Sequence, residues 1–216
     1  MSTDCNKAFW SRIWSAASPE RTSAFVAGFD MSEDIVIHFL KQQHALHICD
    51  AGCGCGIYSL KLSRFGFCVS GFDIAEDAVS LTKALLSENG YQADGFRQAE
   101  ILSTGYEDSC FDAVIARDVI DHMPIKQGIE AVNELLRITR PGGCILLTLD
   151  TTDSEYESEP HETNDDGDYI FHRGKWNGMV FHPYSFHDIG KLANGKPCKI
   201  LSANDSDFIV LIEKGE

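Results

Sequence analysis

The N-terminal part of the chain has hydrophobic positions at helical spacing. In residues 4–17 the large apolar side chains share one helical face: Phe9, Trp10, Ile13 and Trp14. A second stretch, residues 31–43, has the same periodicity, and Ser32 is placed to cap it. We therefore expect residues 1–45 to form helices, and we expect these helices to cover a site built by the rest of the chain.

From residue 46 onward, short apolar runs alternate with amphipathic stretches. The expected strands are residues 46–49, 67–72, 95–100, 111–116 and 144–149, and the expected helices are residues 57–65, 75–88 and 127–138. Such regular alternation indicates parallel βαβ units with helices on both faces of one sheet.

The C-terminal part departs from this alternation. Two apolar runs, residues 199–203 and 208–213, flank a polar turn and predict an antiparallel hairpin. Residues 150–168 are rich in Asp and Glu, contain no Lys or Arg, and are expected to form an exposed acidic insertion. We predict that residues 46–216 form one α/β domain, with a doubly wound, seven-stranded, mostly parallel sheet that ends in an antiparallel hairpin.

A glycine-rich turn lies between the first expected parallel strand and its helix. Gly52, Gly54 and Gly56 occupy alternate positions. Glycine suits a backbone with positive φ, or one that a ligand approaches too closely for a Cβ atom. A dinucleotide fingerprint would need glycine at position 57, where Ile57 stands, and a phosphate-binding Gly-Lys-Ser/Thr sequence is absent.

Asp73 ends the second expected strand, beside the glycine turn at the same edge of the sheet. An acid at this place accepts hydrogen bonds from ribose hydroxyls in nucleotide-binding α/β folds. Together with G-x-G-x-G and no sign of a phosphate-binding turn, Asp73 favours an adenosine ligand without a pyrophosphate.

Four motifs then carry a family resemblance: ICDAGCGCG at residues 48–56, GFDI at 71–74, SCFDAV at 109–114 and LLRITRPGG at 135–143. In this order and at these separations they resemble the class I S-adenosylmethionine-dependent methyltransferases of the small-molecule type. The resemblance covers residues 47–149, close to half the chain. It implies a Rossmann-like methyltransferase fold, S-adenosylmethionine as cofactor, and S-adenosylhomocysteine as product.

The resemblance also implies a cofactor site. In it, Asp50 reaches the amino group of the cofactor, Asp73 binds the ribose diol and Ile74 packs on adenine. Glu100 stands where the family commonly has Asp, a departure that puts its contact with the adenine amino group in doubt. The expected cofactor-binding residues are Asp50, Ala51, Gly52, Cys53, Gly54, Gly56, Asp73, Ile74, Glu100, Ile101 and Arg117.

The sequence indicates the residues that contact the methyl acceptor less clearly. His122 stands at a position where the family often has His, and it is either a general base or a residue that shapes its loop. Trp10 and Trp14 either line the pocket or pack their helix onto the domain. The remaining substrate-side candidates are Asp118, Asp121 and His182. Asp112, at the start of a strand, is expected to make a structural hydrogen bond.

Composition narrows the function classes. The formal net charge of −15 disfavours nucleic acid, whose binding rests on Lys and Arg. No apolar run reaches the roughly 20 residues of a membrane span, and the N-terminus lacks the order of a signal peptide, so we expect a cytoplasmic protein. The eight cysteines lack paired C-x-x-C spacing, and no metal is expected. Monomer and homodimer both remain open.

Three alternatives to methyl transfer to a small molecule remain. The chain could bind S-adenosylmethionine for a non-methylating reaction or as a regulator. A nicotinamide-dependent oxidoreductase is disfavoured by Ile57. A nucleic-acid methyltransferase conflicts with the charge and lacks an Asn/Asp-Pro-Pro-Tyr/Phe motif after the fourth strand.

Overall fold

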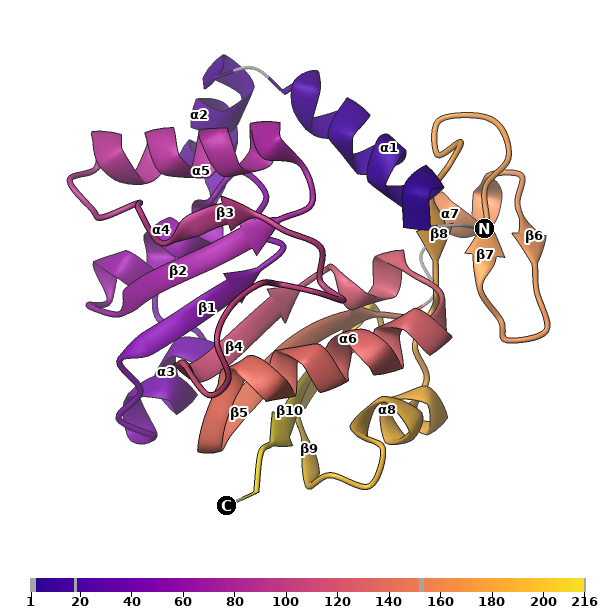
Figure 1. Ribbon diagram of the computed structural model, residues 1–216. Helices are drawn as coiled ribbons and strands as arrows, with labels where there is room; N and C mark the ends of the chain where they lie inside the picture. The colour runs from indigo at the N-terminus through magenta and orange to yellow at the C-terminus, as the bar shows by residue number, and fades with distance from the viewer. Residues whose placement is uncertain (1–2, 18, 152–153, 216) are drawn as a thin grey trace.

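A single large sheet organises the protein, seen here in a computed structural model that describes residues 3–17, 19–151 and 154–215. Its strand order is β3-β2-β1-β4-β5-β10-β9 (Figure 1). The parallel strands are β1 (His47–Ala51), β2 (Cys68–Asp73), β3 (Phe96–Gln98), β4 (Phe111–Arg117) and β5 (Thr139–Asp150). The C-terminal strands β9 (Cys198–Ala203) and β10 (Asp207–Glu213) form a hairpin, and β10 also pairs antiparallel with β5. The predicted seven-stranded, mostly parallel sheet with its terminal hairpin is confirmed.

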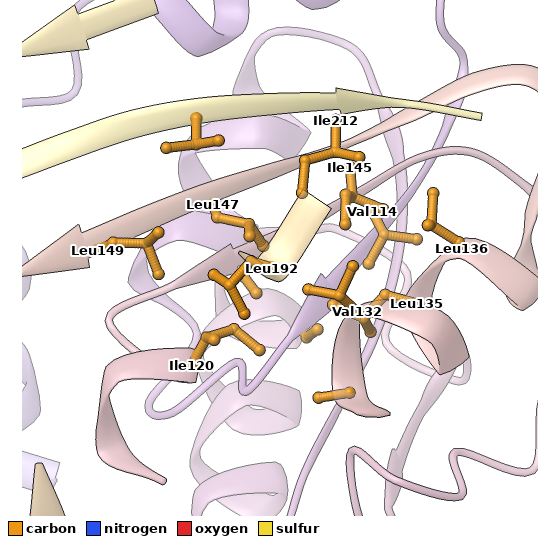
Figure 2. Close-up of a cluster of buried hydrophobic side chains, with 14 of the residues drawn as sticks. Val114, Ile120, Val132, Leu135, Leu136, Ile145, Leu147, Leu149, Leu192 and Ile212 are labelled. Carbon is orange, nitrogen blue, oxygen red and sulfur yellow. The ribbon is translucent and has the colours of Figure 1, made fainter. Parts of the chain in front are cut away.

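Helices cover both faces of this sheet, because its strands are apolar on both sides. The helices of one face are α3 (Ile35–Gln42), α4 (Ile57–Arg64) and α5 (Glu76–Glu88). Those of the other face are α6 (Ile125–Ile138) and α8 (Phe186–Ala193). Figure 2 shows the second face, where Val132 and Leu135 of α6 meet Leu147 of β5 in a buried cluster. Within the described parts of the chain, no helix has the length and apolar character needed to cross a membrane.

The N-terminal helices differ from the prediction in two details. Helix α1 (Thr3–Ser15) lies where expected, but α2 (Pro19–Gly28) was not predicted, since its sequence lacks a continuous apolar stripe. The prediction that Ser32 caps the second helix is wrong. Helix α3 begins at Ile35, and Asp34 caps it by accepting a hydrogen bond from the N–H of Ile37 at 2.9 Å.

A second, three-stranded sheet stands beside the main one (Figure 1). It consists of β6 (Glu162–Thr163), β7 (Tyr169–Ile170) and β8 (Val180–Phe181), with α7 (Ser154–Ser158) before it. Its apolar side chains pack with α1 in a cluster built around Phe9, Phe171, Met179 and Phe181. The expected acidic connection over residues 150–168 is therefore partly folded, because its aromatic flanks supply a small core.

The start of the sheet is fixed by Asp112, which has the structural role expected of it. Its Oδ2 accepts hydrogen bonds from the N–H groups of Leu46 and His47, both at 2.8 Å, and its Oδ1 accepts one from Arg140 Nε at 2.6 Å. These contacts hold the start of β1 against β4, far from the carboxyl ends of the strands.

Replacing Asp112 by alanine should therefore lower the free energy of unfolding by about 1 kcal/mol, the usual value for hydrogen bonds that water can partly replace. Chemical denaturation would measure this loss. Affinity for S-adenosylhomocysteine should stay unchanged, and a large drop in that affinity would contradict the structural assignment.

Candidate functional site

The glycine turn after β1 has the positive φ angles that its sequence predicts. Gly52, Gly54 and Gly56 have φ of +73°, +54° and +83°. A Cβ atom on Gly52 would lie 2.5 Å from Cγ2 of Val119. Side chains at these positions would be strained by the backbone angle and by the space available. The turn therefore keeps a bare backbone at the carboxyl end of β1, where the α/β fold binds its ligands.

Asp73, the last residue of β2, is held next to this turn. Its Oδ2 accepts the N–H of Gly54 at 3.0 Å, and its Oδ1 accepts the N–H of Ala75 at 2.9 Å. The residue is only 6% exposed. Burial raises the pKa of Asp73, and the backbone N–H groups oppose that effect. Each carboxylate oxygen has two lone pairs, so the fixed carboxylate can still accept hydrogen bonds from a ligand.

A cleft with about 620 Å³ of empty volume, including its open mouth, opens at this edge of the sheet. The expected residues that line it are Gly52, Asp73, Ile74, Ile101, Trp10, Trp14, Asp118 and His122. It is also lined by residues that the sequence analysis did not select: Asn6, Phe72, Ala99, Val119 and Met123. The cleft thus joins the predicted cofactor side to the predicted acceptor side.

Asp50 lies behind the glycine turn and does not line the cleft. Its carboxylate accepts a hydrogen bond from Ser59 Oγ at 2.5 Å, and burial raises its pKa to about 6. Arg117 lies with its guanidinium 4.3 Å from the ring centre of Tyr58 and also stays outside the lining. Other cofactor candidates outside the lining are Ala51, which ends β1, and the turn residues Cys53, Gly54 and Gly56.

Glu100 points to α1. Its Oε1 lies 2.8 Å from Lys7 Nζ, and its side chain is 47% exposed. The residues on either side of it, Ala99 and Ile101, line the cleft. The acid expected at the adenine position is therefore engaged in an ion pair with the N-terminal helix.

Helix α1 runs across the side of the sheet to which the parallel strands point and reaches the small sheet (Figure 1). The six-membered ring of Trp14 lies over Gly54, with Cζ2 2.9 Å from the place of a Cβ. Asn6 Nδ2 donates to the carbonyl oxygen of His122 at 2.5 Å. Arg12 donates to the carbonyl of Asn177 at 3.1 Å. These contacts close the outer side of the cleft.

His122 stands at the acceptor end of the cleft, in the short helix η1 (Ile120–His122) after β4. It is 7% exposed, and its buried Nδ1 has no hydrogen-bond partner among the described residues. Burial lowers its pKa to about 4, which keeps the imidazole neutral at physiological pH. Its ring centre is 4.8 Å from that of Trp10 and 6.0 Å from that of Phe181.

Acidic side chains surround this histidine. Asp118 has a left-handed backbone (φ +54°) and is held by Thr148, which accepts its N–H at 2.9 Å and donates to its Oδ1 at 2.6 Å. Asp121 is fully buried, and both its carboxylate oxygens lack a hydrogen-bond partner among the described residues. Burial, with the charge of Asp118, raises the pKa of Asp121; burial, with the charge of Asp121, raises that of Asp150.

His182 lies outside the cleft lining. Its Nδ1 is 2.9 Å from Asp168 Oδ1 in a buried pair, and its backbone N–H donates to the carbonyl of Asp121 at 2.7 Å. It connects β8 to η1. In residues 3–17, 19–151 and 154–215, no group of three His, Cys, Asp or Glu side chains is arranged to hold a metal ion.

The geometry fits an adenosine-containing cofactor. A Cβ-free turn, a buried carboxylate at the end of β2 and the apolar side chains of Ile74 and Ile101 meet in one cleft. Sugar hydroxyls can bond to Asp73, and a flat base can lie between the two isoleucines.

Comparison with known proteins agrees with this geometry. A family model described as "Methyltransferase domain" matches residues 42–183, about two thirds of the chain. A ubiquinone biosynthesis O-methyltransferase of Klebsiella pneumoniae is 26% identical over 101 residues, which are 47% of this chain and 41% of that protein. The chain thus matches less than half the length of this relative.

Solved structures share the fold. An S-adenosylmethionine-dependent methyltransferase of Methanosarcina mazei superposes with a TM-score of 0.67 at 22% identity, over 85% of this chain and 99% of that one. Magnesium protoporphyrin IX methyltransferase of Synechocystis PCC 6803, with S-adenosylmethionine bound, gives 0.61 at 18% identity over 97% of both chains.

Proposed function

Because the chain belongs to the class I S-adenosylmethionine-dependent methyltransferases, we propose that it transfers the methyl group of this cofactor to a small molecule at the His122 end of the cleft. The observation that supports this most directly is the continuity of the cleft. Asp73 and Ile74 line it on the cofactor side, and Trp10, Asp118 and His122 line it beyond the glycine turn. One cavity can therefore hold donor and acceptor together.

On the cofactor side we assign binding to four residues. Asp73 accepts the ribose hydroxyls, Gly52 lets the ligand approach its backbone, and Ile74 with Ile101 packs on the adenine ring. Asp50 supports the turn from behind through Ser59. The bound cofactor supplies a methyl group already activated by a sulfonium.

The protein must then mainly align the reacting atoms. Aligned reactants gain about 7–11 kcal/mol relative to free ones. Helix α1, tied to Glu100 and to the His122 carbonyl, covers one side of the cleft. The imidazole of His122 is neutral and can hydrogen-bond the acceptor, although its lowered pKa makes it a weak base.

Calorimetry with S-adenosylhomocysteine and with NAD tests this proposal. We expect binding of S-adenosylhomocysteine and none of NAD, because the turn has Ile57 where a pyrophosphate-binding turn has glycine. A second assay adds S-adenosylmethionine and a metabolite extract and measures release of S-adenosylhomocysteine. Binding without release would favour a non-methylating role, and lack of binding would exclude the cofactor assignment.

A further inference from the structure

The polar groups in the cleft share one property: they favour a ligand that donates hydrogen bonds or carries positive charge. The polar side chains of the lining are Asn6, Asp73, Asp118 and His122, and no Lys or Arg is among the described lining residues. An acceptor with a carboxylate or phosphate would find no cationic side chain in this lining.

Two buried polar atoms at this end, Asn6 Oδ1 and His122 Nδ1, lack hydrogen-bond partners among the described residues. Asn6 uses its Nδ2 for the His122 carbonyl, which leaves the buried Oδ1 unpaired. His122, 93% buried, lines the cleft with its Nδ1 unpaired. Unpaired buried polar atoms are costly, so a ligand that reached them with hydrogen-bonding groups would be favoured at this end of the cleft.

Asp118 adds a fixed negative charge. Its left-handed backbone and its paired hydrogen bonds with Thr148 hold the residue at the cleft wall. Asp121 is buried and its carboxylate has no hydrogen-bond partner in the part of the chain that the structure describes; its charge and that of Asp118 both act on Asp150, the last residue of β5. Trp10 offers an aromatic ring beside His122, as cation-binding pockets do.

We propose that the methyl acceptor is an amine that enters the cleft as an ammonium ion, with an apolar body between Trp10 and Met123. This rests on the proposed methyl transfer and specifies its substrate class. Before transfer the ammonium loses one proton to solvent water at the open mouth of the cleft. The freed nitrogen lone pair then forms the N–C bond as the methyl carbon–sulfur bond breaks. The products are a methylated ammonium, a neutral thioether and the one proton already released to solvent.

This assignment separates an amine from a phenol or an acid. A phenol must lose its proton to become a strong nucleophile, and the phenolate would then face Asp118 with like charge. A carboxylic acid would meet the same repulsion without a cation to offset it. An ammonium is attracted at the same place.

The test uses two apolar bodies, each with three head groups: phenethylamine, 2-phenylethanol and 3-phenylpropionate, and hexylamine, 1-hexanol and heptanoate. Calorimetry measures their binding to the protein saturated with S-adenosylhomocysteine. We expect each amine to bind at least about tenfold more tightly than its alcohol and its acid. If neither amine binds more tightly than its two counterparts, the proposal is wrong.

Two matched variants complete the test. Asp118→Asn keeps a residue type that tolerates positive φ and removes the charge, and it should weaken amine binding about tenfold while affecting S-adenosylhomocysteine much less. Asp94→Asn, an exposed acid outside the cleft lining, should change neither affinity. An unchanged amine affinity in Asp118→Asn would overturn the proposal. If the unmodified protein does not bind S-adenosylhomocysteine, the proposed function itself is refuted.

Discussion

Replacing Asp73 by alanine is expected to weaken the binding of S-adenosylhomocysteine by about a hundredfold or more. A hydrogen bond to a charged group contributes about 1.5–3 kcal/mol, and we assign two of them to the ribose hydroxyls. Since about 1.4 kcal/mol is a factor of ten, two such bonds give at least a hundredfold. Calorimetry on the purified variant measures the change.

Asp73 also accepts the N–H groups of Gly54 and Ala75, so its removal could distort the turn. The variant Asp73→Asn keeps the size and one acceptor oxygen but turns its NH2 toward one of these two N–H groups, and it should lose about tenfold or more in affinity. Asp77→Ala, an exposed acid in the first turn of α5, is the matched control and should bind normally. Full affinity in Asp73→Ala would exclude Asp73 from the cofactor site.

The main sheet was predictable from sequence because its signals are local. Strands β1, β2 and β4 are short apolar runs, each followed by a turn and a helix, and βαβ connections place successive strands in one sheet. The exact extent of β5 was not predictable. It begins at Thr139, five residues before the apolar run, because Thr139 pairs with Phe111 through a register shift.

The small sheet was not predictable for the opposite reason. Its strands have two residues each, too short for an alternating pattern to be recognised. They are stabilised by tertiary packing of Phe171, Met179 and Phe181 against Phe9, more than 150 residues away in sequence. The acidic composition of residues 150–168 indicated exposure and concealed this core.

The residues of the candidate site were likewise predictable where the signal is local and not where the contact is distant in sequence. The glycine turn and Asp73 were found because strand ends of a parallel sheet meet at one edge. Asn6 was missed, since its contact with His122 spans 116 residues. One signal could have indicated it: Asn6 precedes Trp10 by four positions and therefore shares its helical face. The contacts of Glu100 and Arg117 could not be predicted from sequence. Their partners lie far away in the chain, Lys7 in α1 and Tyr58 in α4.

Replacing Asp121 by asparagine is expected to raise the free energy of unfolding at pH 8 by about 2 kcal/mol, the order of the cost of a buried polar group whose hydrogen bonds the described residues do not make. Burial raises the pKa of Asp121 above the usual 3.8, with Asp118 adding to the effect. A carboxyl whose pKa is raised by folding binds its proton more tightly in the folded state. The carboxyl therefore contributes to the free energy of unfolding at low pH, and this contribution is lost as the pH rises through the folded-state pKa.

Urea denaturation at pH 5 and pH 8 measures this effect. The advantage of Asp121→Asn over the unmodified protein should be large at pH 8 and small at pH 5, where the carboxyl keeps its proton. Asp94→Asn, exposed to solvent, should show no such difference. Asparagine is neutral at both pH values and can donate a hydrogen bond toward Asp150, so it replaces the protonated acid without a charge. The loss of unfolding free energy between pH 5 and pH 8 should be smaller in Asp121→Asn than in the unmodified protein. An equal loss in both proteins would show that Asp121 is not the group that titrates.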